Sequence, residues 1–127
     1  MRLPELAPVF EQFPEVKLAY FFGSRATSEP GPLSDYDFAI YVDDPDPSRV
    51  LEIRLALLSQ LQQRLGTDQV DLLVLNQVES SELKYEIVAG GILLFERDPF
   101  RVLVEPRVLN EYFDFRDLLR RHGLTKA

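Results

Sequence analysis

The order of apolar and polar residues along the chain predicts four short β-strands. Each is a run of Val, Leu, Ile and aromatic residues bounded by Gly, Pro, Asp or Ser. The four runs are residues 16–22, 34–42, 69–75 and 92–96. The segments between them have apolar residues at intervals of three and four, which predicts helices. We therefore expect an α+β fold in which helices flank a small mixed β-sheet.

The predicted helices have recognisable starts and ends. They are residues 5–13, 48–65, 81–89 and 99–121. Asp46-Pro47 is typical of a helix start and Gly66 of a helix end. Because of its prolines, the run Asp43-Asp44-Pro45-Asp46-Pro47 is interpreted as a strand-to-helix loop and not as a metal cluster. The C-terminal helical segment contains Pro106, and its aromatic side either packs in the core or forms part of a partner interface.

Gly23 and Ser24 follow the first predicted strand and have the chemistry of a phosphate-binding turn. Gly23 has no Cβ, so a ligand can approach its backbone closely. Ser24 offers a hydroxyl, and a helix that begins after it would present amides to an anion. We interpret Ser24 as a contact of a nucleotide triphosphate.

Three aspartates lie on the next two predicted strands. Because side chains alternate along a strand, Asp35 and Asp37 share one face of residues 34–42. Asp71 is the only acid within the apolar run of the third strand, where a carboxylate needs a partner. If these two strands are neighbours in register, the three carboxylates form a triad that can hold two hard cations such as Mg²⁺.

Each signal also has an ordinary structural explanation. Gly-Ser after a strand is usually a simple turn, and Asp-x-Asp at a strand start is often a solvated end. Asp71 alone could protect an edge strand against association. The combination favours a nucleotidyl-transfer site, because no folding requirement explains all three features together.

The same residues carry a family resemblance. The run Gly23-Ser24-Arg25-Ala26, followed by Ser34-Asp35-Tyr36-Asp37 and by Asp71, resembles the minimal nucleotidyltransferase (MNT) group of the DNA polymerase β superfamily. The resemblance extends through residues 85–88 and 93–98 to residues 112–116, so it covers nearly the whole chain. Thr27-Ser28 departs from the Arg-Gly that many relatives carry at this place. The chain is similar in particular to the MntA-type antitoxins that work with HEPN-domain ribonuclease toxins.

This resemblance implies a polymerase-β-like nucleotidyltransferase fold in a single domain, residues 1–127. It implies a metal-dependent enzyme that transfers AMP from ATP to a hydroxyl group of a HEPN toxin. The implied acceptor is a tyrosine, and the transfer neutralises the toxin. Two Mg²⁺ ions are the implied cofactors, ATP the substrate, and a hetero-oligomer with the toxin the implied assembly. The implied catalytic and metal-binding residues are Asp35, Asp37 and Asp71, and the implied nucleotide-binding residues are Gly23, Ser24, Arg25 and Ser34.

Composition narrows the class of protein further. A length of 127 residues with 46% hydrophobic content suits one domain with one core. The lack of cysteine excludes a disulfide framework, and no apolar run approaches the roughly 20 residues of a membrane span. The start, Met1-Arg2-Leu3-Pro4-Glu5, has no signal-peptide character, so we expect a cytoplasmic protein. A net charge of −7 argues against nucleic acid as a direct ligand.

Three functions are compatible with these features. The first is adenylyl transfer to a protein, because a chain of this size has no additional domain to enclose a small acceptor. The second is an antitoxin that masks its partner by binding alone. The third is nucleotide transfer to a small molecule or an RNA end, for which we find no acceptor-binding feature.

Overall fold

A computed structural model of the 127-residue chain describes residues 3–23 and 36–123, where four strands form one sheet. The strand order is β3-β2-β1-β4, with β1 antiparallel to both β2 and β4 and with β2 parallel to β3. The strands are β1 (Val16–Phe22), β2 (Tyr36–Val42), β3 (Val70–Val74) and β4 (Ile92–Glu96). The predicted mixed sheet is confirmed.

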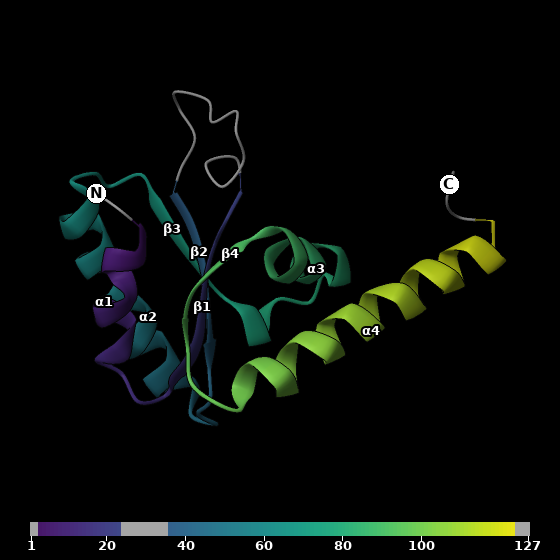
Figure 1. Cartoon of the computed structure of the whole chain (residues 1–127), viewed down its shortest axis with the longest axis horizontal. Coiled ribbons are helices and arrows are strands. Elements are labelled where there is room, and N and C mark those ends of the chain that lie inside the picture. Colours follow the sequence, from purple (N-terminus) through teal and green to yellow (C-terminus); the bar gives the residue numbers. More distant parts are fainter. Residues whose placement is uncertain (1–2, 24–35, 124–127) are drawn as a thin grey trace.

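Helices cover both faces of this sheet (Figure 1). They are η1 (Leu3–Leu6), α1 (Ala7–Glu11), α2 (Pro47–Leu65), η3 (Leu75–Gln77), α3 (Ser81–Gly90) and α4 (Phe100–Arg121). In the described part of the chain, none of these helices is both long and apolar enough to cross a lipid bilayer. The α+β class predicted from the sequence is confirmed.

Alternating side chains of the strands build two apolar layers, one on each face. On the first face, Phe38 and Ile40 of β2 pack with Leu57 of α2. On the second face, Ala39 of β2 packs with residues of α3 and α4, including Val104. Odd-numbered and even-numbered residues of β2 therefore belong to different layers. Asp37 lies on the same face of the strand as Ala39.

The strand and helix bounds agree closely with the sequence pattern. β1 and β4 have the predicted bounds, and β2 is confirmed from Tyr36 onward, because residues 34–35 lie outside the described ranges. The sequence pattern predicts β3 at residues 69–75, but the strand begins one residue later, and it ends one residue earlier because Leu75 begins a 3-10 turn. Within residues 5–13, Pro8 indicates that only a short helix is regular, and α1 is indeed short, with η1 before it. The residue before a proline avoids helical angles, which explains why the helix ends ahead of Phe13-Pro14.

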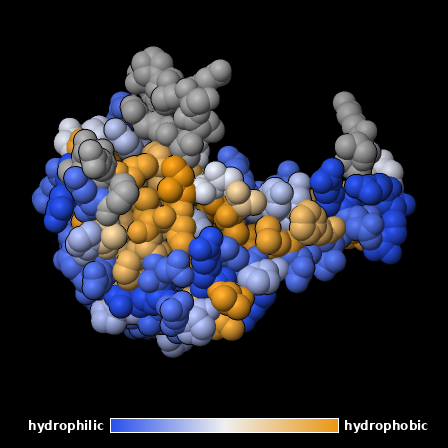
Figure 2. Space-filling model, in the orientation of Figure 1, coloured by the Kyte–Doolittle hydropathy of each residue, from blue (hydrophilic) through white to orange (hydrophobic). Residues whose placement is uncertain are grey.

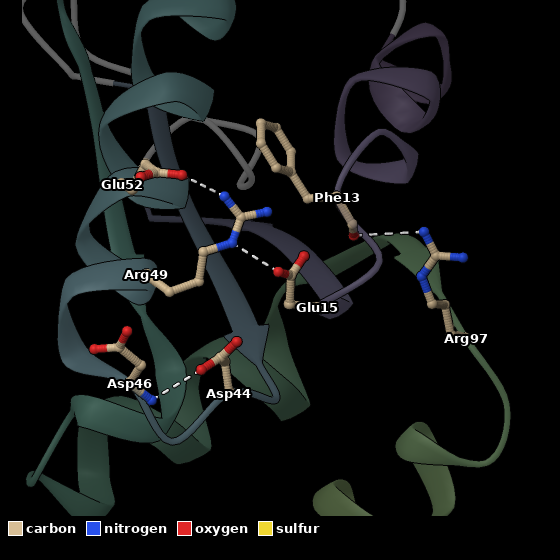
Figure 3. Close-up of polar contacts among 7 residues, drawn as sticks. All are labelled: Phe13, Glu15, Asp44, Asp46, Arg49, Glu52 and Arg97. Atoms are coloured by element: carbon tan, nitrogen blue, oxygen red, sulfur yellow. Dashed lines mark hydrogen bonds and ion pairs between the residues drawn. The ribbon is translucent and has the colours of Figure 1, made fainter.

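The loop between β2 and α2 uses its acids to start the helix, as predicted. The Asp44 carboxylate accepts a hydrogen bond from the Asp46 amide at 2.8 Å (Figure 3). The Asp46 side chain in turn accepts one from the Ser48 amide at 3.0 Å. Arg49 then reaches back to Glu15 at 2.7 Å, and this hydrogen bond lowers the pKa of the Glu15 carboxyl. These acids are accounted for by helix capping and chain connection.

Candidate active site

Three of the seven predicted site residues lie in the described ranges. They are Gly23, which follows β1, Asp37 in β2 and Asp71 in β3. The other four, Ser24, Arg25, Ser34 and Asp35, lie outside the described residues, as does the run that begins with Thr27-Ser28. The roles predicted for these four residues stay predictions.

Asp37 and Asp71 lie side by side on neighbouring strands. β2 and β3 are parallel, and the Cα atoms of Asp37 and Asp71 are partners in the register. Ala39, two residues after Asp37, and Leu73, two residues after Asp71, pack on the side of the sheet that α3 and α4 cover. Because side chains alternate along a strand, both carboxylates face that side. Asp37 is half-buried and Asp71 is exposed. The condition set by the sequence, two neighbouring strands in register, is met for this pair.

Gly23 lies against the carboxylate of Asp37. Its φ is +85°, in the left-handed region, and Phe22 immediately before it is the register partner of Asp37. A Cβ on Gly23 would lie 2.3 Å from Asp37 Oδ2 and 3.1 Å from its Cγ. Real Cβ atoms do not approach another atom so closely, so only glycine leaves the Asp37 carboxylate in its place. The turn after β1 and the acid of β2 thus form one unit.

The donor set fits a hard divalent cation. Two carboxylates on adjacent strands repel each other in the absence of a cation, and carboxylate oxygens are the ligands that Mg²⁺ prefers. Among the described residues, no three His, Cys, Asp or Glu side chains form a metal-binding group. The predicted triad requires Asp35, so within the described ranges only its Asp37 and Asp71 pair is observed together.

The sequence reasoning missed a contribution of Gly91. In the sequence, Gly90-Gly91 indicates only the end of the helix predicted at residues 81–89, but a Cβ on Gly91 would lie 2.3 Å from the Ile87 carbonyl oxygen and 3.1 Å from that of Phe21. Gly91 therefore lets the end of α3 lie against β1, two residues before Gly23. The signal was present, because two successive glycines stand where one is enough to end a helix.

Comparisons with known proteins bear on the family and the fold of the chain. A family model described as polymerase beta, nucleotidyltransferase matches residues 5–100. A comparison with curated protein sequences gave no significant match. Several solved structures share the fold. A chain from a toxin–antitoxin structure with AMP-PNP is 22% identical, with a TM-score of 0.74, and the match covers 95% of this chain and 94% of that chain.

Two further structures are similar over comparable lengths. A chain from a toxin–antitoxin MntA–HepT structure is 22% identical with a TM-score of 0.66, and the match covers 94% of this chain and 91% of that one. The second is a chain from a structure of tri-AMPylated Shewanella oneidensis HEPN toxin in complex with MNT antitoxin. It is 21% identical with a TM-score of 0.67, and the match covers 94% of this chain and 90% of that one. These likenesses establish the fold. Since the family model matches most of the sequence, this chain belongs to the polymerase beta nucleotidyltransferase family.

Proposed function

We propose that this chain is an antitoxin-type protein adenylyltransferase. It transfers AMP from ATP to the hydroxyl group of a tyrosine in a partner HEPN ribonuclease toxin. The observation that carries the proposal is the register pairing of Asp37 with Asp71 beside Gly23, in a chain of nucleotidyltransferase family. Chains of the same fold occur in structures with AMP-PNP and with a tri-AMPylated HEPN toxin, which supports this choice of nucleotide and acceptor.

In this proposal the residues around Gly23 hold the nucleotide. Gly23 leaves room for the phosphates, and Ser24, Arg25 and Ser34 contact them. Asp35, Asp37 and Asp71 are the ligands that would hold two Mg²⁺ ions, which neutralise charge on the phosphates and polarise the acceptor hydroxyl when bound. The chain itself supplies orientation, because the fixed register of β2 and β3 holds Asp37 and Asp71 on one face.

The proposed reaction is a direct displacement at the α-phosphorus of ATP. The acceptor oxygen forms a bond to this phosphorus, the bond to the β-phosphate oxygen breaks, and pyrophosphate leaves. The proton of the acceptor hydroxyl passes to a carboxylate oxygen of Asp71. Asp71 suits this role because it is exposed beside the half-buried Asp37, so an acceptor can reach it from outside.

We also propose that residues 1–127 act as a single domain in the cytoplasm, where ATP and the toxin are present. No part of the described chain encloses the exposed Asp71. The acceptor protein therefore covers one side of the site when it binds, and this favours a protein over a small molecule as the acceptor.

Replacing the paired aspartates tests the catalytic proposal. Asp37→Asn, like Asp35→Asn, should reduce AMP transfer to the HEPN protein by about a hundredfold or more, because several kcal/mol of charge stabilisation depend on the lost carboxylate. Asp71→Asn should lower turnover more than ATP affinity. Asp44→Asn is a matched control, since Asp44 is also half-buried but lies at the other end of β2. Transfer is followed with labelled ATP, and full labelling by Asp37→Asn would refute the assigned site.

A masking antitoxin is the second candidate, because α4 exposes apolar side chains that suit binding. The two functions differ in what they require for neutralisation. Under the transfer proposal, Asp37→Asn binds the toxin without neutralising it, and the wild type neutralises only with ATP and Mg²⁺. Neutralisation by Asp37→Asn at equal stoichiometry would instead show masking.

A further inference from the structure

The C-terminal half of α4 stands clear of the rest of the described molecule. Figure 1 shows α4 running past α3 and away from the sheet. Its first half is held by Val104 and Val108, which are buried against the sheet. Its last contacts with α3 are the pairing of Glu111 with Lys84 at 2.8 Å and the ring contacts of Tyr112 and Phe113 with Tyr85, whose ring centroid lies 4.0 Å and 5.9 Å from theirs. Beyond this point, the only side-chain ion pair or hydrogen bond of the described helix is internal, between Arg121 and Asp117.

The apolar stripe of α4 nevertheless continues along this free half. From Val108, steps of four, three and four residues lead to Tyr112, Phe115 and Leu119, the spacing of one helix face. Phe115 and Leu119 belong to neither apolar layer of the core, and Leu118 beside them is 48% exposed. Figure 2 shows hydrophobic side chains along this arm. Phe115 and Leu119 are themselves half-buried, and the exposed apolar side chains beside them are Phe113 and Leu118. This half of α4 thus presents apolar surface that the core does not cover.

The charge on α4 differs from that of the rest of the chain. α4 contains five arginines and four acidic residues, whereas the whole chain has a net charge of −7. All other residues together therefore carry a net −8. Among the described residues, Arg116 and Arg120 have no ion-pair partner, and both flank the apolar stripe. A partner with acidic side chains is attracted to α4 and repelled by the remaining surface.

A second copy of the chain fits this face poorly. In a symmetric pair of antiparallel α4 helices the same patch meets itself, so Arg116 would approach Arg116 of the other copy. The remaining molecules, each with net negative charge, would repel as well. An unlike protein with an apolar groove and acidic edges avoids both costs.

We propose that the free end of α4, residues 114–121, is the docking helix for a partner protein, which receives the stripe of Phe115 and Leu119 in an apolar groove and pairs carboxylates with Arg116 and Arg120. This inference rests on the proposed function in one respect, since the partner is taken to be the HEPN-type acceptor. Docking by α4 brings that protein to the open side of the site without using Asp37 or Asp71 for affinity.

The test measures binding of a HEPN-type toxin protein, without ATP, by isothermal titration calorimetry. The double variant Phe115→Ser with Leu119→Ser should weaken binding by about tenfold or more, as truncation of buried interface anchors does. Tyr112 and Phe113 are left intact because both contact Tyr85. The matched control is Leu51→Ser with Leu55→Ser on α2, an apolar pair at the same spacing whose members are 53% and 52% exposed. The control should change affinity by no more than about twofold.

A charge variant tests the second part of the proposal. Arg116→Glu with Arg120→Glu should slow association several-fold at low salt, and the difference should shrink as salt rises. Arg64→Glu is the control, because Arg64 is exposed and, like Arg120, lies in the last turn of its helix. Equal slowing by Arg64→Glu would show a non-specific charge effect and would overturn the pairing with α4.

The outcomes separate this inference from the catalytic proposal. If the wild type binds and transfers AMP, and the Phe115 and Leu119 variant does both equally well, the docking helix is refuted while the enzyme stands. If the wild type binds without transfer, the catalytic proposal fails and the affinities still decide the docking helix. No binding by the wild type overturns the assigned partner. A dimer of the chain alone in analytical ultracentrifugation that the double variant dissociates would show that a second copy covers α4, and it would also refute the proposal.

Discussion

Gly23 and Asp37 depend on each other, and this pair fixes the geometry of the candidate site. The glycine has a positive φ, and its bare Cα leaves the space in which the Asp37 carboxylate lies. A substitution here has two separate costs. One is backbone strain in the left-handed region, and the other is displacement of the carboxylate.

A comparison of two glycines separates these costs. Gly66 also has a positive φ, +68°, but a Cβ there would meet no atom within 4 Å. Both Gly23→Ala and Gly66→Ala should lose about 1 kcal/mol of stability or more through strain. Only Gly23→Ala should also lose AMP transfer, because the new methyl group moves Asp37. Thermal unfolding and labelled-ATP transfer measure the two effects, and full activity of folded Gly23→Ala would contradict the role of this contact.

Part of the geometry of this site could be predicted from the sequence pattern, and part could not. Alternation along residues 34–42 correctly assigned Asp37 to the face opposite Phe38, because that depends only on the period of a strand. The pairing of Asp37 with Asp71 needed the strand order, which arises from packing between distant segments. The contact between Gly23 and Asp37 could not be predicted, because it depends on where one side chain lies relative to another strand.

At the scale of elements, α4 is held to the sheet by a partly buried polar contact. The Tyr20 hydroxyl of β1 donates a hydrogen bond to Glu105 of α4 at 2.5 Å. Burial, strengthened by this hydrogen bond to Glu105, raises the pKa of the Tyr20 phenol well above its ordinary value. The Tyr20 ring also belongs to the apolar layer that contains Val104 and Val108 of α4. Tyr20 therefore attaches α4 to the sheet both by apolar packing and by a hydrogen bond.

Tyr20→Phe should lower the free energy of unfolding by about 1–3 kcal/mol at neutral pH, because the hydrogen bond to a carboxylate is lost. The wild type should also lose stability as pH rises above about 10, where the unfolded tyrosine ionises while the folded one keeps its proton. Tyr20→Phe should show a shallower fall in that range. Chemical denaturation between pH 7 and 11 measures both effects.

Tyr41→Phe serves as the control for this prediction. Tyr41 packs against the same layer, and its hydroxyl has no hydrogen-bond partner among the described residues. The variant should keep both the stability and the pH dependence of the wild type. A pH dependence of Tyr20→Phe equal to that of the wild type would show that Tyr20 does not hold its proton in the fold.

The elements themselves were largely predictable because their signals are local. Asp46 and Gly66 mark the ends of α2, and both act as the sequence indicated, one through its side chain and one through a positive φ. α4 runs through Pro106 although that residue cannot donate a backbone hydrogen bond. Whether the aromatic side of α4 packs or stays open could not be decided from periodicity. Only the arrangement of α3 and the sheet shows that its second half extends beyond them (Figure 1).

At the scale of the whole molecule, two separate regions carry the features for catalysis and for partner binding. The paired aspartates lie at one end of the sheet, and the arginines that are unpaired among the described residues lie with the apolar stripe that the core does not cover on the far half of α4. In our account the first region transfers AMP and the second brings the acceptor. Binding and chemistry should therefore be lost independently, the first by changes in α4 and the second by changes at Asp37.

The most direct measurement is the intact mass of the HEPN-type partner after incubation with this chain, ATP and Mg²⁺. The account predicts that the partner gains mass in steps of one AMP unit with the wild type. Asp37→Asn should give no such gain while still binding the partner, and Asp44→Asn should behave as the wild type. An unchanged partner mass with bound, folded wild-type protein, or AMP-sized gains with Asp37→Asn, would contradict the central claim.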